Sequence, residues 1–140
     1  MLETLIKDLL NDLEIDEDEI SKKEDMTSVP IDEELWLHFR ALSGQGVHIK
    51  ATIGDCPERK LEDFYTGVMQ GNLFGNLSGG AVIALDESGK KLTLNLTIAY
   101  NPSYSDFYSE VERFVNYVDF WKGQVQEHEK ACDQSQDLLH

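Results

Sequence analysis

The sequence has few of the residues that build metal sites, disulfide frameworks or membrane spans. It contains two cysteines, Cys56 and Cys132, which are far apart and lack CxxC or Cys/His ligand spacing. No apolar run approaches the roughly 18 residues of a membrane helix, and the N-terminus lacks a basic segment followed by an uninterrupted apolar stretch. We therefore expect no metal, no cofactor, no membrane partner and a reducing compartment such as the cytosol.

Positively charged residues are also scarce, with 12 Lys and Arg against 27 Asp and Glu and a formal net charge of -15. Such a chain repels phosphate backbones and anionic membrane surfaces, so nucleic acid is not an expected partner. The acidity can serve solubility, recognition or both, and the sequence leaves these roles open.

Prolines and glycines, 3 and 10 respectively, are too few for a collagenous or low-complexity chain. The length of 140 residues is within the range that one hydrophobic core supports. We predict a single domain over residues 1–140 without a linker.

The first half of the chain predicts one helix followed by strands. Residues 2–13 place apolar side chains at the three- and four-residue spacing of one helix face. The acidic stretch 12–25 is expected to form a solvated loop or a frayed helix end. Residues 26–31 contain a proline, which confines them to an edge or a short irregular strand. Strict alternation over 35–41 and 47–53 predicts an antiparallel hairpin.

The second half predicts a helix, a hairpin and a further helix. Residues 55–58 resemble a helix start. Asp55 offers an N-cap acceptor three residues before Glu58, and Pro57 lies in the first turn, where no amide hydrogen bond is lost. Strands are expected over 81–85 and 91–100, joined by a turn that contains glycine. A helix restarts at 101–103, and residues 126–140 are expected to fray because they have little to bury.

This order is helix, two to three strands, helix, two strands, helix. It predicts an α+β fold in which the helices pack on a twisted antiparallel sheet. Strand 91–100 carries a row of leucines beside the apolar segment 68–85. Because this apolar surface exceeds what one layer of three helices is expected to cover, we expect self-association, with a second covered face as the alternative.

Candidate catalytic and ion-binding groups fail on spacing or context. Cys56 could act as a nucleophile only if the fold brought His38 or His48 within hydrogen-bond reach, and no local signature supports this pairing. An EF-hand starting at Asp12 fails because its sixth position is Glu17 rather than glycine. We therefore expect a protein that is not an enzyme.

The element order, the acidity and the stretch from Phe64 to Tyr100 resemble the class I chaperones of bacterial type III secretion, the Tir chaperone family. The most specific part is the helix end VMQGNL at 68–73, followed by the strand GGAVIALD at 79–86 and LTL at 92–94. The acidic stretch that precedes the first strand departs from the family's pattern.

The resemblance implies a cytoplasmic bacterial homodimer that binds the N-terminal segment of a secreted effector in extended form and keeps it soluble and secretion-competent. A disordered segment can add a strand to a sheet edge and place apolar side chains in grooves. The expected effector contacts are Leu5, Leu9, Val29, Ile31, Trp36, His38 and Arg40. The expected dimer interface contains Val68, Leu73, Phe74, Leu92, Leu94 and Leu96.

Two alternatives stay open at this point. Trp36 could pack beneath a helix instead of anchoring an effector. The protein could also be an intracellular adaptor or regulatory protein that binds a folded partner rather than an extended one.

Overall fold

Alternating and helical hydrophobic patterns produce the elements of this chain in the computed structural model. The structure describes the backbone of residues 1–74 and 80–138, and the side chains of residues 1–70 and 80–134. In chain order the elements are α1 (Leu2–Leu13), η1 (Glu17–Glu19), β1 (Ser21–Lys23), β2 (Met26–Pro30), β3 (Trp36–Ala41), β4 (Val47–Asp55), α2 (Leu61–Phe74), β5 (Val82–Leu85), β6 (Lys91–Ile98) and α3 (Tyr104–Leu138).

The strands form one six-stranded antiparallel sheet in the order β1-β2-β3-β4-β6-β5. The predicted hairpins 35–41/47–53 and 81–85/91–100 are both present, as β3–β4 and β5–β6. Strands β4 and β6 are neighbours inside the sheet, although they are far apart in the sequence. The strands β1 and β5 are the two edges.

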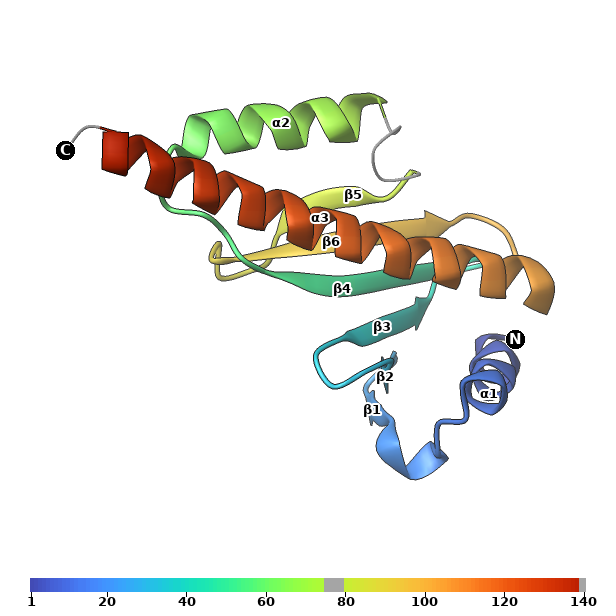
Figure 1. Ribbon diagram of the computed structural model, residues 1–140. Helices are drawn as coiled ribbons and strands as arrows, with labels where there is room; N and C mark the ends of the chain where they lie inside the picture. The colour runs from blue at the N-terminus through green and yellow to red at the C-terminus, as the bar shows by residue number, and fades with distance from the viewer. Residues whose placement is uncertain (75–79, 139–140) are drawn as a thin grey trace.

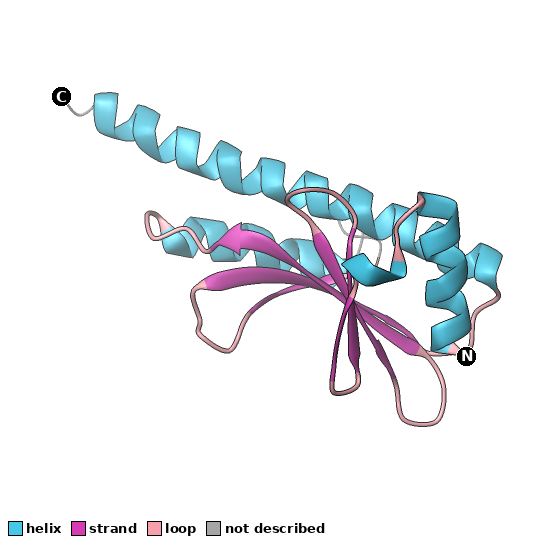
Figure 2. Ribbon diagram, turned by 90° about the horizontal axis from the view of Figure 1, so that it is seen from below, coloured by secondary structure: helices cyan, strands magenta, loops and turns pink. Residues whose placement is uncertain are grey.

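The helices cover one face of this sheet (Figure 1). Alternate residues of β2, β3, β4 and β6 point to that face and form one hydrophobic cluster with α1, α2 and α3. Phe39 on β3 and Phe107 on α3 are fully buried, with ring centroids 5.7 Å apart. Figure 2 shows α2 and α3 running together along one side of the fan of strands. The predicted α+β architecture of helices on an antiparallel sheet is confirmed.

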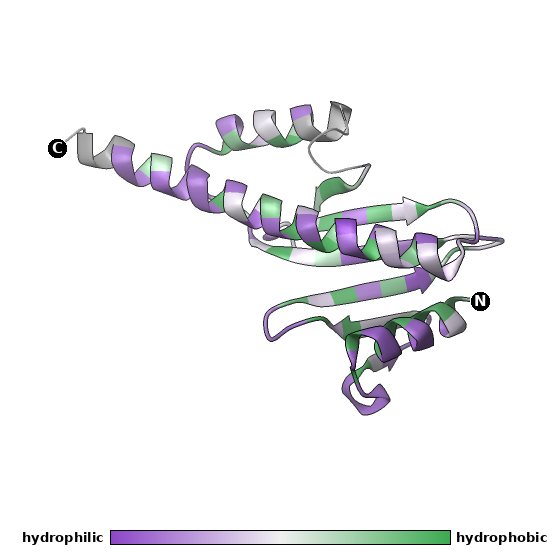
Figure 3. Ribbon diagram, turned by 45° about the vertical axis from the view of Figure 1, so that its right-hand side comes forward, coloured by the Kyte–Doolittle hydropathy of each residue, from purple (hydrophilic) through white to green (hydrophobic). Residues whose placement is uncertain are grey.

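Hydropathy alternates along the strands and around α3, as Figure 3 shows. The residues of β4 are buried at alternate positions from Val47 to Ile53. This alternation is the sequence signal that predicted the strands, and it separates a covered face from an open face.

The stretch 12–25 is more structured than predicted. It contains the turn η1 and the short strand β1, which pairs with residues 26–28 of β2. Strand β2 is therefore not an edge strand. Its Pro30 nevertheless lies beyond the end of β1, so the missing amide proton interrupts no hydrogen bond to that strand.

The second helix begins later than predicted. Residue Asp55 ends strand β4, where it pairs with Lys91, and the backbone amide of Cys56 donates to the carbonyl of Lys90 at 2.8 Å. Pairing with β6 therefore continues through the segment that resembles a helix cap, and α2 starts only at Leu61.

The third helix continues to Leu138, so the predicted fraying of residues 126–140 is wrong up to that point. Arg59, which precedes α2, donates to Glu129 at 2.7 Å and to Asp133 at 2.8 Å. Cys132 is only 2% exposed, and the carbonyl of Arg59 lies 2.7 Å from Nε2 of His128. The helix end is held by this long-range contact, for which the local sequence gives no signal.

Candidate functional site

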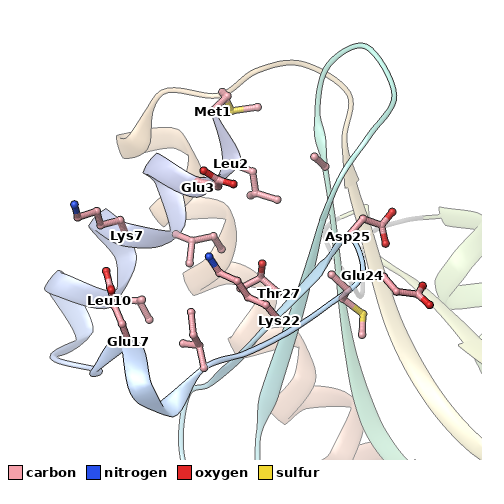
Figure 4. A pocket seen from close by; sticks show the side chains of 14 residues that line it. Met1, Leu2, Glu3, Lys7, Leu10, Glu17, Lys22, Glu24, Asp25 and Thr27 are labelled. Atoms are coloured by element: carbon pink, nitrogen blue, oxygen red, sulfur yellow. The ribbon is translucent and has the colours of Figure 1, made fainter.

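A groove opens between α1 and the first two strands at the β1 end of the sheet (Figure 4). Its volume is about 830 Å³. The lining residues are Met1, Leu2, Glu3, Ile6, Lys7, Leu10, Glu17, Ile20, Lys22, Glu24, Asp25, Met26, Thr27 and Ala41. The groove therefore joins one flank of a helix to an edge of the sheet.

The groove has an apolar wall and a charged rim. Leu2, Ile6 and Leu10 follow one another at four-residue spacing along α1, so they form one row on that helix. Ile20 and Met26 stand across from this row and are only partly buried. Acidic and basic side chains around these residues give the rim both signs of charge. Such a lining suits a chain segment that carries both apolar and polar side chains.

Strand β1 forms one border of the groove and is an edge of the sheet. Within the described residues, β1 pairs only with β2. An edge strand presents backbone donors and acceptors to an incoming extended segment. The groove and the edge together can thus hold backbone and side chains of the same bound segment.

The face of the sheet opposite the helices carries a block of basic residues. In the β3–β4 register, His38 stands opposite Lys50 and Arg40 stands opposite His48. Trp36 lies on the same face, two residues before His38, and is 40% exposed. The expectation that Trp36 packs beneath a helix is therefore wrong, since the helices cover the other face.

Both histidines on the open face have depressed pKa values. Partial burial lowers the pKa of His38, and the positive charge of Lys50 lowers it further. Partial burial also lowers the pKa of His48, with Arg40 and Lys50 adding to this effect and a hydrogen bond to Asn95 opposing it. The Oγ atom of Ser28 lies 2.6 Å from Nδ1 of His38. Near neutral pH the histidines thus limit the repulsion inside the basic block.

The structure divides the predicted effector contacts into two groups. Leu5, Leu9 and Val29 belong to the core of the single chain and do not line the groove. Ile31 is partly buried, whereas Trp36, His38 and Arg40 lie on the open face. The groove-lining row of α1 was missed, although its signal was present. Of that row Leu2 is partly buried, whereas Ile6 and Leu10 are 4% and 3% exposed and also belong to the core.

The predicted dimer residues are also mostly core. Val68, Leu92, Leu94 and Leu96 are between 0% and 9% exposed in the single chain. The helices already cover these side chains, so the apolar row on β6 is no reason for self-association. The side chains of Leu73 and Phe74 lie outside the described residues. The exposed apolar residues nearby are Met69, Val82 and Leu85.

Neither cysteine forms a catalytic arrangement in the described part of the chain. The Sγ atom of Cys56 lies 3.7 Å from the hydroxyl of Tyr65, and no contact joins it to the histidines of the open face. A contact that the sequence did not predict places Sγ of Cys132 3.6 Å from Nε2 of His128. Because this thiol is buried and the histidine faces the carbonyl of Arg59, the pair contributes to packing.

Among the described side chains, those of residues 1–70 and 80–134, no cluster of His, Cys, Asp and Glu has a geometry that could hold a metal ion. No helix in residues 1–74 and 80–138 is long and apolar enough to cross a membrane.

Comparison with known proteins gives a family and a shared fold. A model of the Tir chaperone protein (CesT) family matches residues 4–122. A Chlamydia pneumoniae protein is 28% identical over 128 residues, which cover 86% of this chain and 93% of that protein.

Three solved structures have a similar fold. A chain of the HopA1–SchA chaperone–effector complex has a TM-score of 0.68 at 16% identity, covering 87% of this chain and 93% of its own. A chain of the ExsC–ExsE complex has a TM-score of 0.66 at 16% identity, with coverages of 86% and 90%. A chain of the structure of the Yersinia pestis type III secretion chaperone SycH in complex with a stable fragment of YscM2 has a TM-score of 0.59 at 22% identity, with coverages of 84% and 96%.

Proposed function

Since the chain belongs to the Tir chaperone (CesT) family, we propose that it is a type III secretion chaperone which binds the N-terminal segment of an effector in extended form. Binding would keep that segment soluble and competent for secretion in the bacterial cytosol. The family is one of chaperones and not of enzymes, which confirms both the resemblance and the expected lack of catalytic activity.

The observation that carries this proposal is the groove beside the edge strand β1. An extended segment can pair its backbone with Ser21–Lys23 and direct alternate side chains toward the apolar row of α1. Leu2 and Ile20 are partly buried and packed against the core, so they can contact a client without leaving their positions. A client held in this way gains strand pairing but no core of its own.

We further propose that the functional form is a homodimer, as the family resemblance implied. The surface that supports this lies at the opposite edge of the sheet from the groove. Met69 on α2 is 69% exposed, and Val82 and Leu85 on β5 are 45% and 43% exposed. A second copy that covered these side chains would leave the groove of each subunit open to a client.

The test is limited proteolysis of an effector's N-terminal segment with and without the protein. We expect protection of an extended stretch while the segment gains no compact core, as judged by amide exchange. The double variant Leu2→Glu/Ile20→Glu should lose this protection, because each substitution places a charge on the apolar wall. Tyr100→Glu is the matched control and should keep it, because Tyr100 is 49% exposed and lies outside both the groove and the proposed dimer surface.

Two outcomes would contradict the proposal. A compact, folded partner bound at this surface would favour the adaptor alternative. Protection that is equally strong in the groove variant and in the control would place the client elsewhere on the protein.

A further inference from the structure

The open face of the sheet has a charge pattern that the fold itself does not require. The chain has a net charge of -15, yet His38, Arg40, His48 and Lys50 form a two-by-two block on adjacent strands. Each cation stands opposite an imidazole, so like charges face one another across this strand pair only when the histidines are protonated. A cluster of basic groups on the open face of an otherwise acidic protein is typical of a binding site for an anionic partner.

Few acidic groups neutralise this block. The carboxylate of Asp25, in the turn between β1 and β2, lies 3.3 Å from Nε of Arg40. Both side chains of this pair are well exposed, at 48% and 68%. The remaining neighbours on this face are uncharged where they meet the block: Ser28 and Met26 pair across from β3, and Asn95 and Thr97 pair across from β4.

We infer that this open face binds an acidic segment of polypeptide in extended conformation. Residues two apart on a strand are separated by about 6.6 Å. The block therefore matches a strand-like segment with carboxylates at alternate positions. Trp36 continues the same row beside His38 and would contact an apolar side chain of that segment.

The charge of the whole molecule favours a peptide over nucleic acid. A phosphate backbone carries a charge at every nucleotide and would be repelled by the acidic remainder of the protein. A short acidic segment concentrates its charge on the block and leaves the acidic surfaces outside the contact. We assign the segment to the exported client, and this identification rests on the proposed function. The face lies on the opposite side of the sheet from the groove wall of α1 and adjoins the groove at Asp25 and Met26, so it is a second contact beside the first.

The probe is a fluorescein-labelled ten-residue peptide with glutamates at alternate positions and a leucine at one end, measured by anisotropy. Arg40→Gln/Lys50→Gln should weaken its binding about tenfold, as expected for two exposed charge pairs. Lys122→Gln/Lys130→Gln removes the same charge from α3 and is the matched control, which should bind like the parent protein. Asp25→Asn removes the competing carboxylate and should tighten binding.

Protonation gives a second readout. Lowering the pH from 7.5 to about 5 should strengthen binding in the parent protein, because His38 and His48, whose pKa values are lowered, then gain charge beside Arg40 and Lys50 while the glutamates of the peptide stay mostly ionised. In a His38→Gln/His48→Gln variant this pH dependence should disappear.

Several results would overturn the inference. Equal loss of binding in the α3 control would show a nonspecific charge effect. A peptide with the same glutamates in one consecutive run that binds as tightly would refute the extended match. Tighter binding of a ten-nucleotide single-stranded DNA would show a nucleic-acid surface instead.

The two proposals fail separately. If the open face binds no acidic peptide while the groove still protects an effector segment, this inference is wrong and the chaperone function stands. If the peptide binds but no effector segment is protected, the acidic-peptide site stands and the chaperone function fails.

Discussion

Replacing Leu94 with alanine separates a core position from an interface position. Leu94 is 0% exposed and stands between Ala51 on β4 and Ile83 on β5 in the sheet register. Truncating a fully buried leucine costs about 2.7–5 kcal/mol, because the protein loses transfer free energy and keeps a cavity. A domain of this size has a free energy of unfolding of roughly 5–15 kcal/mol, so the variant should lose about a third of it.

The assay is urea unfolding followed by circular dichroism at two protein concentrations. Leu94→Ala should lower the free energy of unfolding by the same amount at both concentrations, since its partners lie in its own chain. The matched control is Leu85→Ala on β5, whose side chain is 43% exposed. That control should cost about 1 kcal/mol or less in the protomer. If Leu85 faces a second copy, the control should also alter the concentration dependence of stability.

One result would refute this reasoning. If Leu94→Ala kept nearly full protomer stability but abolished the concentration dependence, its side chain would face a second copy and not the helices. The row Leu92, Leu94 and Leu96 would then return to the dimer interface in which the sequence placed it.

Three further predictions follow from local contacts. The pKa values of His38 and His48 are lowered in the folded protein, so the unfolded chain takes up protons first as the pH falls. The contribution of these histidines to stability should therefore be fully present above about pH 6.5 and should be lost as the pH drops through the folded pKa values. In urea melts at several pH values, the His38→Gln/His48→Gln variant should show a flatter dependence of stability on pH. Arg59→Gln removes both ion pairs to the end of α3, so backbone amides around residues 129–134 should exchange faster than in the parent protein, while those near residue 110 should not change. An exchange rate around residues 129–134 equal to that of the parent protein would contradict this role of Arg59. Gly46 has φ +106, and a Cβ there would overlap the carbonyl oxygen of Ile98. In thermal melts, Gly46→Ala should therefore destabilise the protein by roughly 2 kcal/mol or more. The control Gly44→Ala should cost less, because open space surrounds that position.

Most of the architecture could be predicted because its signals are local. The two hairpins follow from strict alternation, and α1 follows from its apolar spacing, so the structure confirms both. The start of α2 could not be predicted in this way. The same residues that resemble a helix cap continue the pairing of β4 with β6, and that long-range pairing prevails over the local preference.

The candidate site was also predictable only where its signals are local. Alternation along the strand predicted that Trp36, His38 and Arg40 share one face, and in the structure they lie together on the open face of the sheet. The sequence could not show that Lys50 and His48 stand opposite these residues, since register depends on the turn between the strands. The groove was missed for a similar reason, because it exists only where α1 meets strands that follow it in the chain.

The sequence by itself determined the acidic character, the alternation that makes an antiparallel sheet and the family to which the chain belongs. These properties depend on neighbouring residues or on the pattern of the whole chain. Only the tertiary structure decided which leucines are core, where the third helix ends and where a groove opens beside the sheet edge. Each of these depends on which distant side chains cover a surface, and burial is set by the packed chain rather than by the hydrophobicity of one residue.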